Sequence, residues 1–246
     1  MNLLQAAKGY ELSYKGQIDF WTPYWINEPG VMQHPLKGKG SPEQIQAAAD
    51  RIFEAHPWEM SNAEEARHLL MRNGLGIDCS GFIYHVLNAY LRDQGLAALE
   101  SYLVVPKKDI TSASTKGSWR EQFEENKVRI ENWPEFIPLQ EVCHVFSKPP
   151  QDLVNVQRLI SSESTFQVLA ITEVQAGDMV YSSGEYGDHI YLIMVSEEGK
   201  ITLASSNFDP VGTGGVVIKV IETTDFKKIY PKATIHRLKI LGERNE

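Results

Sequence analysis

A cysteine at position 79 stands where the chain passes from an irregular segment into an apolar pattern with helical spacing, in the sequence GIDCSGFIYHVL. The pattern predicts a long helix that begins at Asp78 or Cys79, which puts the thiol in the first turn. The free N–H groups and positive dipole end of a helix favour a thiolate, which is a nucleophile. Ser80 and Gly81 are small enough to leave the sulfur open, and the Cys79 N–H can hold an oxyanion. The alternative is a buried, inert cysteine at the start of a core helix.

A cysteine nucleophile needs a base, which is usually a histidine held by a third polar group. Among the seven histidines, His189 begins a predicted strand directly after a turn, where its side chain can face a groove. A three-residue loop at 197–199 would set Asn207 directly opposite His189, with Ser205 diagonal to it on the same face. A two-residue loop would place Ser206 there instead. The predicted third group is therefore Ser205 or Asn207.

The elements around these residues predict an α+β protein, with helices first and an antiparallel meander after them. Helices are expected over 42–55, over about 61–74, and from Asp78 or Cys79 to near Gly95. Strands are expected at GDMVYSS, DHIYLIMVS, KITLASSN and GGVVIKVI. Residues 1–40, rich in Trp, Tyr, Pro and Gly, are expected to form an irregular arm on a single domain that spans residues 1–246.

Composition and charge argue against several classes of function. The chain is 42% hydrophobic with a formal net charge of −8, which disfavours nucleic acid or an anionic membrane as the main partner. No stretch approaches the roughly 18 apolar residues of a membrane span. The start MNLLQAAKGY lacks the features of a signal peptide, so we expect a cytoplasmic protein unless a leader has been removed. Two cysteines, with no C-x-x-C or H-E-x-x-H pattern, predict neither a metal site nor a disulfide framework.

The segment GIDCSGFIYHVL resembles the D-C-S-G-hydrophobic signature of the NlpC-type cell-wall peptidases, a family of papain-like cysteine peptidases and amidases. Other segments follow in the family's order. QAGDMVYSS resembles the strand before the family's catalytic histidine, GDHIYLIM is similar to the histidine strand, and ITLASSN to the next strand. Upstream, IFEAHPWEMS resembles the Pro-aromatic element before the cysteine. The resemblance covers residues 42–95 and 171–241.

This resemblance implies a papain-like fold in which a helix that begins at the catalytic cysteine packs on an antiparallel sheet. It implies a cysteine peptidase or amidase with Cys79 as nucleophile and His189 as base, which requires no cofactor. Trp58, Asp78 and Ser80 would line the substrate groove. The substrate would be a bacterial cell-wall peptide with D-residues, met inside the cell as a recycled muropeptide fragment.

Three departures from the family pattern bear on specificity. The cysteine and histidine lie further apart than in the family, so residues 97–170 are interpreted as an insertion near the groove. Trp58 stands where the family has a tyrosine whose hydroxyl commonly helps to bind substrate. The third catalytic position aligns with Leu203, Ser205 or Asn207, and a leucine cannot orient an imidazole. The same groove would also suit a catalytically silent peptide-binding module, or an acyltransferase with the same Cys-His pair.

Overall fold

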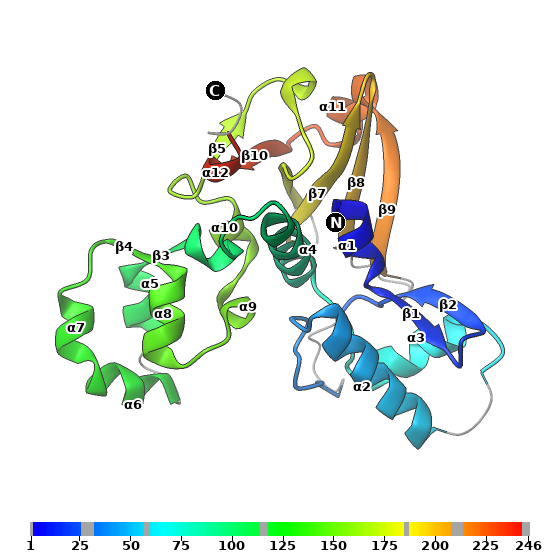
Figure 1. Ribbon diagram of the computed structural model, residues 1–246, viewed down its shortest axis with the longest axis horizontal. Coiled ribbons are helices and arrows are strands. Elements are labelled where there is room, and N and C mark those ends of the chain that lie inside the picture. The colour runs from blue at the N-terminus through cyan, green and yellow to red at the C-terminus, as the bar shows by residue number, and fades with distance from the viewer. Residues whose placement is uncertain are drawn as a thin grey trace.

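An antiparallel sheet of six strands supports the protein, and the helix that begins at Cys79 packs on one of its faces (Figure 1). The computed structural model describes residues 2–25, 32–56, 60–113, 118–184, 187–207 and 214–242. The strands, in their order across the sheet, are β5 (Thr165–Val168), β10 (Thr234–Leu238), β6 (Met179–Gly184), β7 (Gly187–Glu197), β8 (Lys200–Asn207) and β9 (Gly215–Glu222). Helices and an antiparallel sheet confirm the predicted α+β class.

The hairpin of β7 and β8 sets the register around His189. Glu197 pairs with Lys200, so the loop has two residues and the predicted three-residue loop is wrong, although its glycine, Gly199, does adopt a left-handed conformation with φ of 77°. A β-bulge between Ile193 and Val195 then shifts the pairing by one residue. Beyond the bulge Leu192 pairs with Ala204, and this register, three residues further on, brings Asn207 opposite His189 as predicted.

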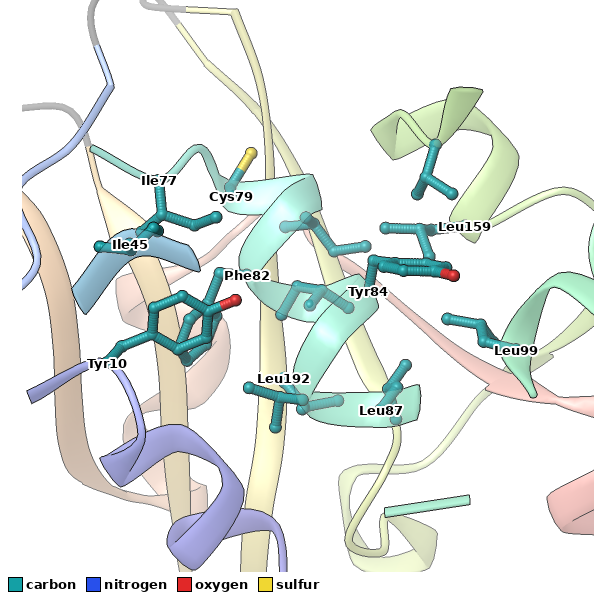
Figure 2. Close-up of a cluster of buried hydrophobic side chains, with 14 of the residues drawn as sticks. Tyr10, Ile45, Ile77, Cys79, Phe82, Tyr84, Leu87, Leu99, Leu159 and Leu192 are labelled. Atoms are coloured by element: carbon teal, nitrogen blue, oxygen red, sulfur yellow. The ribbon is translucent and has the colours of Figure 1, made fainter. Parts of the chain in front are cut away.

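Helix α4, Cys79–Asp93, is the central helix of the core. Asp78 is its N-cap, where Oδ1 accepts a hydrogen bond from the Gly81 N–H at 2.6 Å. Beyond its end Gly95 takes a φ of 70°, which glycine tolerates without strain. The buried apolar side chains of α4 lie in one cluster with Ile190 and Leu192 of β7 (Figure 2). Burial of that face against the sheet stabilises the position of the whole helix.

The other face of the sheet carries a second, smaller apolar cluster. Phe226 and Tyr230 lie in it together with Ile193 and Leu203. A short 3-10 helix, η3 (Thr223–Asp225), and the helix α11 (Phe226–Ile229) bring these aromatic rings under the sheet. Alternation along β7 therefore divides its side chains between two cores.

The N-terminal third forms α1 (Leu3–Lys8), β1 (Glu11–Tyr14), β2 (Ile18–Trp21), α2 (Pro42–Ala55) and α3 (Ala63–Arg72). The predicted helix over 42–55 is confirmed, with a capping box between Ser41 and Gln44. The prediction of an irregular arm is wrong for its first half, because α1 is capped by Asn2 and a two-stranded hairpin follows. Helix α1 has six residues, too few to show a helical period in the sequence.

The long crossover between Cys79 and His189 builds most of a separate lobe beside α4 (Figure 1). Its elements are η1 (Leu99–Ser101), β3 (Val104–Pro106), α5 (Lys107–Ala113), α6 (Ser118–Glu125), α7 (Lys127–Glu131), β4 (Phe136–Pro138), α8 (Leu139–Phe146), α9 (Pro150–Leu153) and α10 (Val156–Leu159). The end of the predicted insertion, β5, instead pairs with β10 and belongs to the main sheet. The chain continues through η2 (Ile171–Glu173) before β6 and ends its described part in α12 (Lys239–Gly242). No described helix has the length and apolar character needed to cross a membrane.

A buried ion pair fixes β10 to the start of β6. Asp178 is fully buried, and both of its carboxylate oxygens accept hydrogen bonds from the Arg237 guanidinium, at 2.7 and 2.9 Å. We expect Asp178→Asn to lower the free energy of unfolding by about 3 kcal/mol, because it leaves a partly buried guanidinium without its counter-charge. Urea denaturation measures the change. Glu222→Gln, at an exposed pair with Lys200, is the matched control and should leave stability nearly unchanged; equal losses would contradict the prediction.

Candidate functional site

Cys79 is the first residue of α4, and its sulfur lies at the end of the helix, directed away from the core beneath it (Figure 2). Only 6% of the residue is exposed. Burial and the Asp78 carboxylate raise the pKa of the Cys79 thiol to about 11. Backbone hydrogen bonding from Ile190 and Ser80 and the charge of Lys39 act to lower that pKa. The expectation that the helix N-terminus lowers the pKa of Cys79 is therefore wrong, and the thiol depends on a base to deprotonate it.

His189 is held through its Nε2 atom by both predicted third groups. Nε2 lies 2.7 Å from Oδ1 of Asn207 and 2.9 Å from Oγ of Ser205. The single hydroxyl proton of Ser205 is directed to the carbonyl oxygen of Ile190, 2.6 Å away, so Ser205 can only accept from the imidazole. Because both neighbours of Nε2 are acceptors, Nε2 carries the proton and Nδ1 carries the lone pair. His189 therefore has the tautomer of a base at Nδ1.

The environment of the imidazole keeps it uncharged. Burial lowers the pKa of His189 to about 4, and Lys219 acts in the same direction, against the hydrogen bond to Asn207. The ring also meets Tyr191 edge to face, with 4.6 Å between ring centroids. Tyr191 is in turn covered by the ammonium of Lys219, 4.9 Å from its centroid. Packing and hydrogen bonds together thus restrict the orientation of the His189 ring.

Ile190 joins the two halves of the site. Its backbone acts to lower the pKa of the Cys79 thiol on one side, and its carbonyl accepts the Ser205 hydroxyl that fixes the imidazole on the other. Within the described residues the thiol and the imidazole are not hydrogen-bonded to each other. The Cys79 N–H likewise donates to no described acceptor, as expected for the first turn of a helix. The free protein therefore holds a neutral thiol and a neutral imidazole on adjoining elements.

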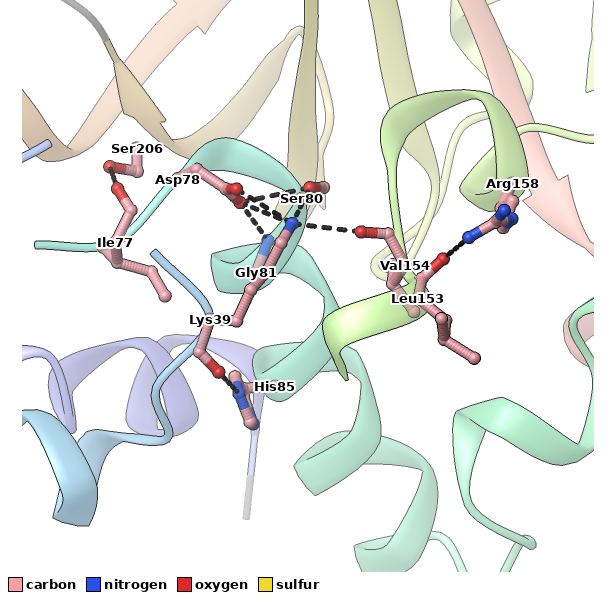
Figure 3. A network of polar contacts seen from close by, with 10 residues as sticks. All are labelled: Lys39, Ile77, Asp78, Ser80, Gly81, His85, Leu153, Val154, Arg158 and Ser206. Carbon is pink, nitrogen blue, oxygen red and sulfur yellow. Dashed lines mark hydrogen bonds and ion pairs between the residues drawn. The ribbon is translucent and has the colours of Figure 1, made fainter. Parts of the chain in front are cut away.

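Of the three residues predicted to line a substrate groove, the structure describes two, Asp78 and Ser80. Asp78 caps α4 and pairs with Lys39, whose Nζ lies 2.8 Å from Oδ2 (Figure 3). Ser80 is buried and bonded to the same ammonium and carboxylate. Trp58 lies outside the described residues. Their role in binding substrate stays a prediction.

Two residues of the site, Tyr191 and Lys39, were not predicted from the sequence. Tyr191 stands two positions after His189, and strand alternation alone would have put both side chains on one face. Lys39 gave no signal, because it lies in the segment interpreted as an irregular arm, far from Cys79 along the chain.

Other polar clusters do not compete with this one for catalysis. His85 lies inside α4, and its Nε2 is bonded to the Lys39 carbonyl oxygen at 2.9 Å. It lines a cavity of about 290 Å³ between α1, α2 and α4, whose lining includes neither Cys79 nor His189. Among the residues that the structure describes, no three His, Cys, Asp or Glu side chains are grouped to hold a metal ion.

Comparison with known proteins adds no relative to this picture. No family model, curated protein or solved structure matches the chain.

The lowered pKa of His189 predicts a pH dependence of stability. Above about pH 6.5 neither the folded nor the unfolded chain binds a proton at His189; between its ordinary value of 6.5 and about 4, only the unfolded chain does. The free energy of unfolding should therefore fall by about 3 kcal/mol on this account as pH drops through that range. Urea denaturation at several pH values, with His189→Gln, should show a smaller fall in the variant.

A His189→Gln variant with the same dependence as wild type would show that His189 is not held neutral.

Proposed function

We propose that the protein is an NlpC-type, papain-like cysteine hydrolase that cleaves a peptide or amide bond. One observation carries the proposal: Ser205 and Asn207 fix His189 with Nδ1 as its basic atom. His189 directly precedes Ile190, whose backbone acts to lower the pKa of the Cys79 thiol. A helix that begins at a cysteine and packs on an antiparallel sheet supports the proposal further.

In the proposed reaction His189 Nδ1 takes the thiol proton while Cys79 Sγ attacks the carbonyl carbon. The carbonyl π electrons move to oxygen, and the unpaired Cys79 N–H stabilises the resulting oxyanion. The oxyanion collapses, the C–N bond breaks, and His189 gives its proton to the leaving amine. Water then attacks the thioester, with His189 as base, and releases the acid and the thiol.

The proposed mechanism places the costly proton transfer after substrate binding. The pKa of Cys79 is about 11 and that of His189 about 4, so the resting pair is neutral and not a thiolate–imidazolium ion pair. Catalytic hydrogen bonds are often long in free enzymes and form when substrate binds. In the proposed mechanism Sγ passes its proton to Nδ1 as it attacks an electrophilic carbon, so proton transfer accompanies bond formation.

We propose a bacterial cell-wall peptide with D-residues as the substrate. The D-C-S-G segment and the order of the strand motifs after it support this choice. The fully buried Ser206, whose hydroxyl donates to the Ile77 carbonyl oxygen at 2.7 Å, ties β8 to the segment before Cys79. This contact would hold the two walls of a groove in place while a peptide enters it.

A catalytically silent peptide-binding module is the second candidate. The burial of Cys79, its raised pKa and the missing hydrogen bond to His189 favour it. The two candidates predict opposite reactivities for the two thiols of the chain.

Cys143 provides an internal reference for the reactivity of Cys79. Burial raises the pKa of both thiols to about 11, yet Cys143 is the more exposed. If His189 acts as a base, iodoacetamide near neutral pH should modify Cys79 faster than Cys143, and His189→Ala should slow Cys79 alone by about tenfold or more. Mass spectrometry of peptides over time measures both rates. A Cys79 that reacts more slowly than Cys143, and equally in the variant, would support the silent module.

Cleavage is tested with a muropeptide digest analysed by mass spectrometry. Cys79→Ala should abolish cleavage, and His189→Ala should slow it by about 10²- to 10⁴-fold, the usual contribution of a positioned base. Cys143→Ala is the matched control and should cleave at the wild-type rate. Added amines show whether the acyl group also passes to nitrogen instead of water. Cleavage that survives Cys79→Ala would overturn the mechanism.

A further inference from the structure

Lys39 connects three segments that are distant in the sequence. Its ammonium lies 2.8 Å from the Asp78 carboxylate, contacts the Ser80 hydroxyl, and donates to the Val154 carbonyl oxygen at 3.0 Å (Figure 3). An ammonium has three N–H donors, and these three residues use all of them. The Lys39 side chain is 15% exposed, so the charge is held in place and is poorly screened by water.

The carboxylate that Lys39 meets has two conflicting effects on the site. As the N-cap, Asp78 accepts the Gly81 N–H and fixes the residue at which α4 begins. As a negative charge beside Cys79, it opposes both a thiolate and an oxyanion held at the Cys79 N–H. The cap is needed for geometry, and its charge works against the chemistry.

The crossover holds the ammonium in position from the opposite side. Val154 is buried, and α10, which follows it, contacts both α4 and β7. Gln157 donates to the carboxylate of Asp188, the residue before His189, at 2.7 Å. Residues 154 and 157 are thus bound next to the two catalytic positions, so Lys39 meets a fixed carbonyl group and not a loose loop.

We infer that Lys39 is a positioning residue of the Cys79 site, which neutralises the Asp78 cap so that negative charge can develop at the sulfur and at the oxyanion. The inference rests on the proposed function in one respect, since it assumes that charge does develop there. The charge of Lys39 also counts among the influences that favour the Cys79 thiolate. Substrates would therefore experience a helix start that is capped but carries no net charge.

The test removes the two charges separately and together. Lys39→Met leaves Asp78 uncompensated, and we expect alkylation of Cys79 by iodoacetamide at pH 8 to slow about tenfold, with its pH profile displaced to higher pH by about one unit. Asparagine caps helices as well as aspartate does, so Lys39→Met with Asp78→Asn keeps the cap without the charge. This double variant should return the rate to within about twofold of wild type. Lys39→Arg should retain most of it, because it keeps the charge.

The controls separate a charge effect from a loss of structure. Lys200→Met, at the far end of the β7–β8 hairpin, should not change the Cys79 rate, and Cys143 serves as the reference thiol in every variant. The inference is overturned if Lys39→Met reacts like wild type, or if the double variant stays as slow as Lys39→Met, because the lysine would then act only as a structural tie. Should the charge variants behave as expected while wild type leaves muropeptides intact, the proposed hydrolase function fails and the role of Lys39 stands.

Discussion

The hydrogen bond from the Gly81 N–H to the Asp78 carboxylate decides where α4 begins, and the rest of the site depends on that point. A helix that began one residue later would leave Cys79 outside the first turn, and one that began a full turn earlier would pair the Cys79 N–H with a carbonyl of the same helix. The Asp78 cap fixes the first residue of α4, but its negative charge disfavours a thiolate at Cys79. The lysine from the N-terminal segment and the crossover carbonyl behind it resolve that conflict.

The imidazole is controlled by a hydroxyl that does not donate to it. The Ser205 hydroxyl donates its single proton to the Ile190 carbonyl oxygen. Its oxygen can therefore only accept a hydrogen bond from His189. The Ile190 carbonyl of β7, which fixes the Ser205 proton, thereby helps to set the tautomer of His189. A hydroxyl committed in this way is a more rigid partner than an amide, which can rotate and present either of its ends.

The sequence predicted the elements better than it predicted the chemistry between them. The helix over 42–55 and the start of α4 carry strong local signals, an N-cap followed by apolar residues at helical spacing, and both were predicted correctly. Helix α1 and the hairpin after it were missed, because short elements stabilised by tertiary packing leave little periodicity. The pKa of Cys79 was predicted in the wrong direction, since helix position is local and visible in sequence, whereas burial depends on the whole fold.

The bulge in β7 shows why residue spacing alone could locate Asn207 although the loop was misjudged. A two-residue turn with one bulged residue and a three-residue turn without a bulge use the same number of residues between His189 and Asn207. Two backbone conformations of the hairpin, one with a bulge and one with a longer turn, therefore fit the same number of residues between His189 and Asn207. Chains related to this one could exchange one solution for the other by moving a single residue between strand and turn. Such a change would leave no insertion or deletion in an alignment, and the imidazole would keep its partner.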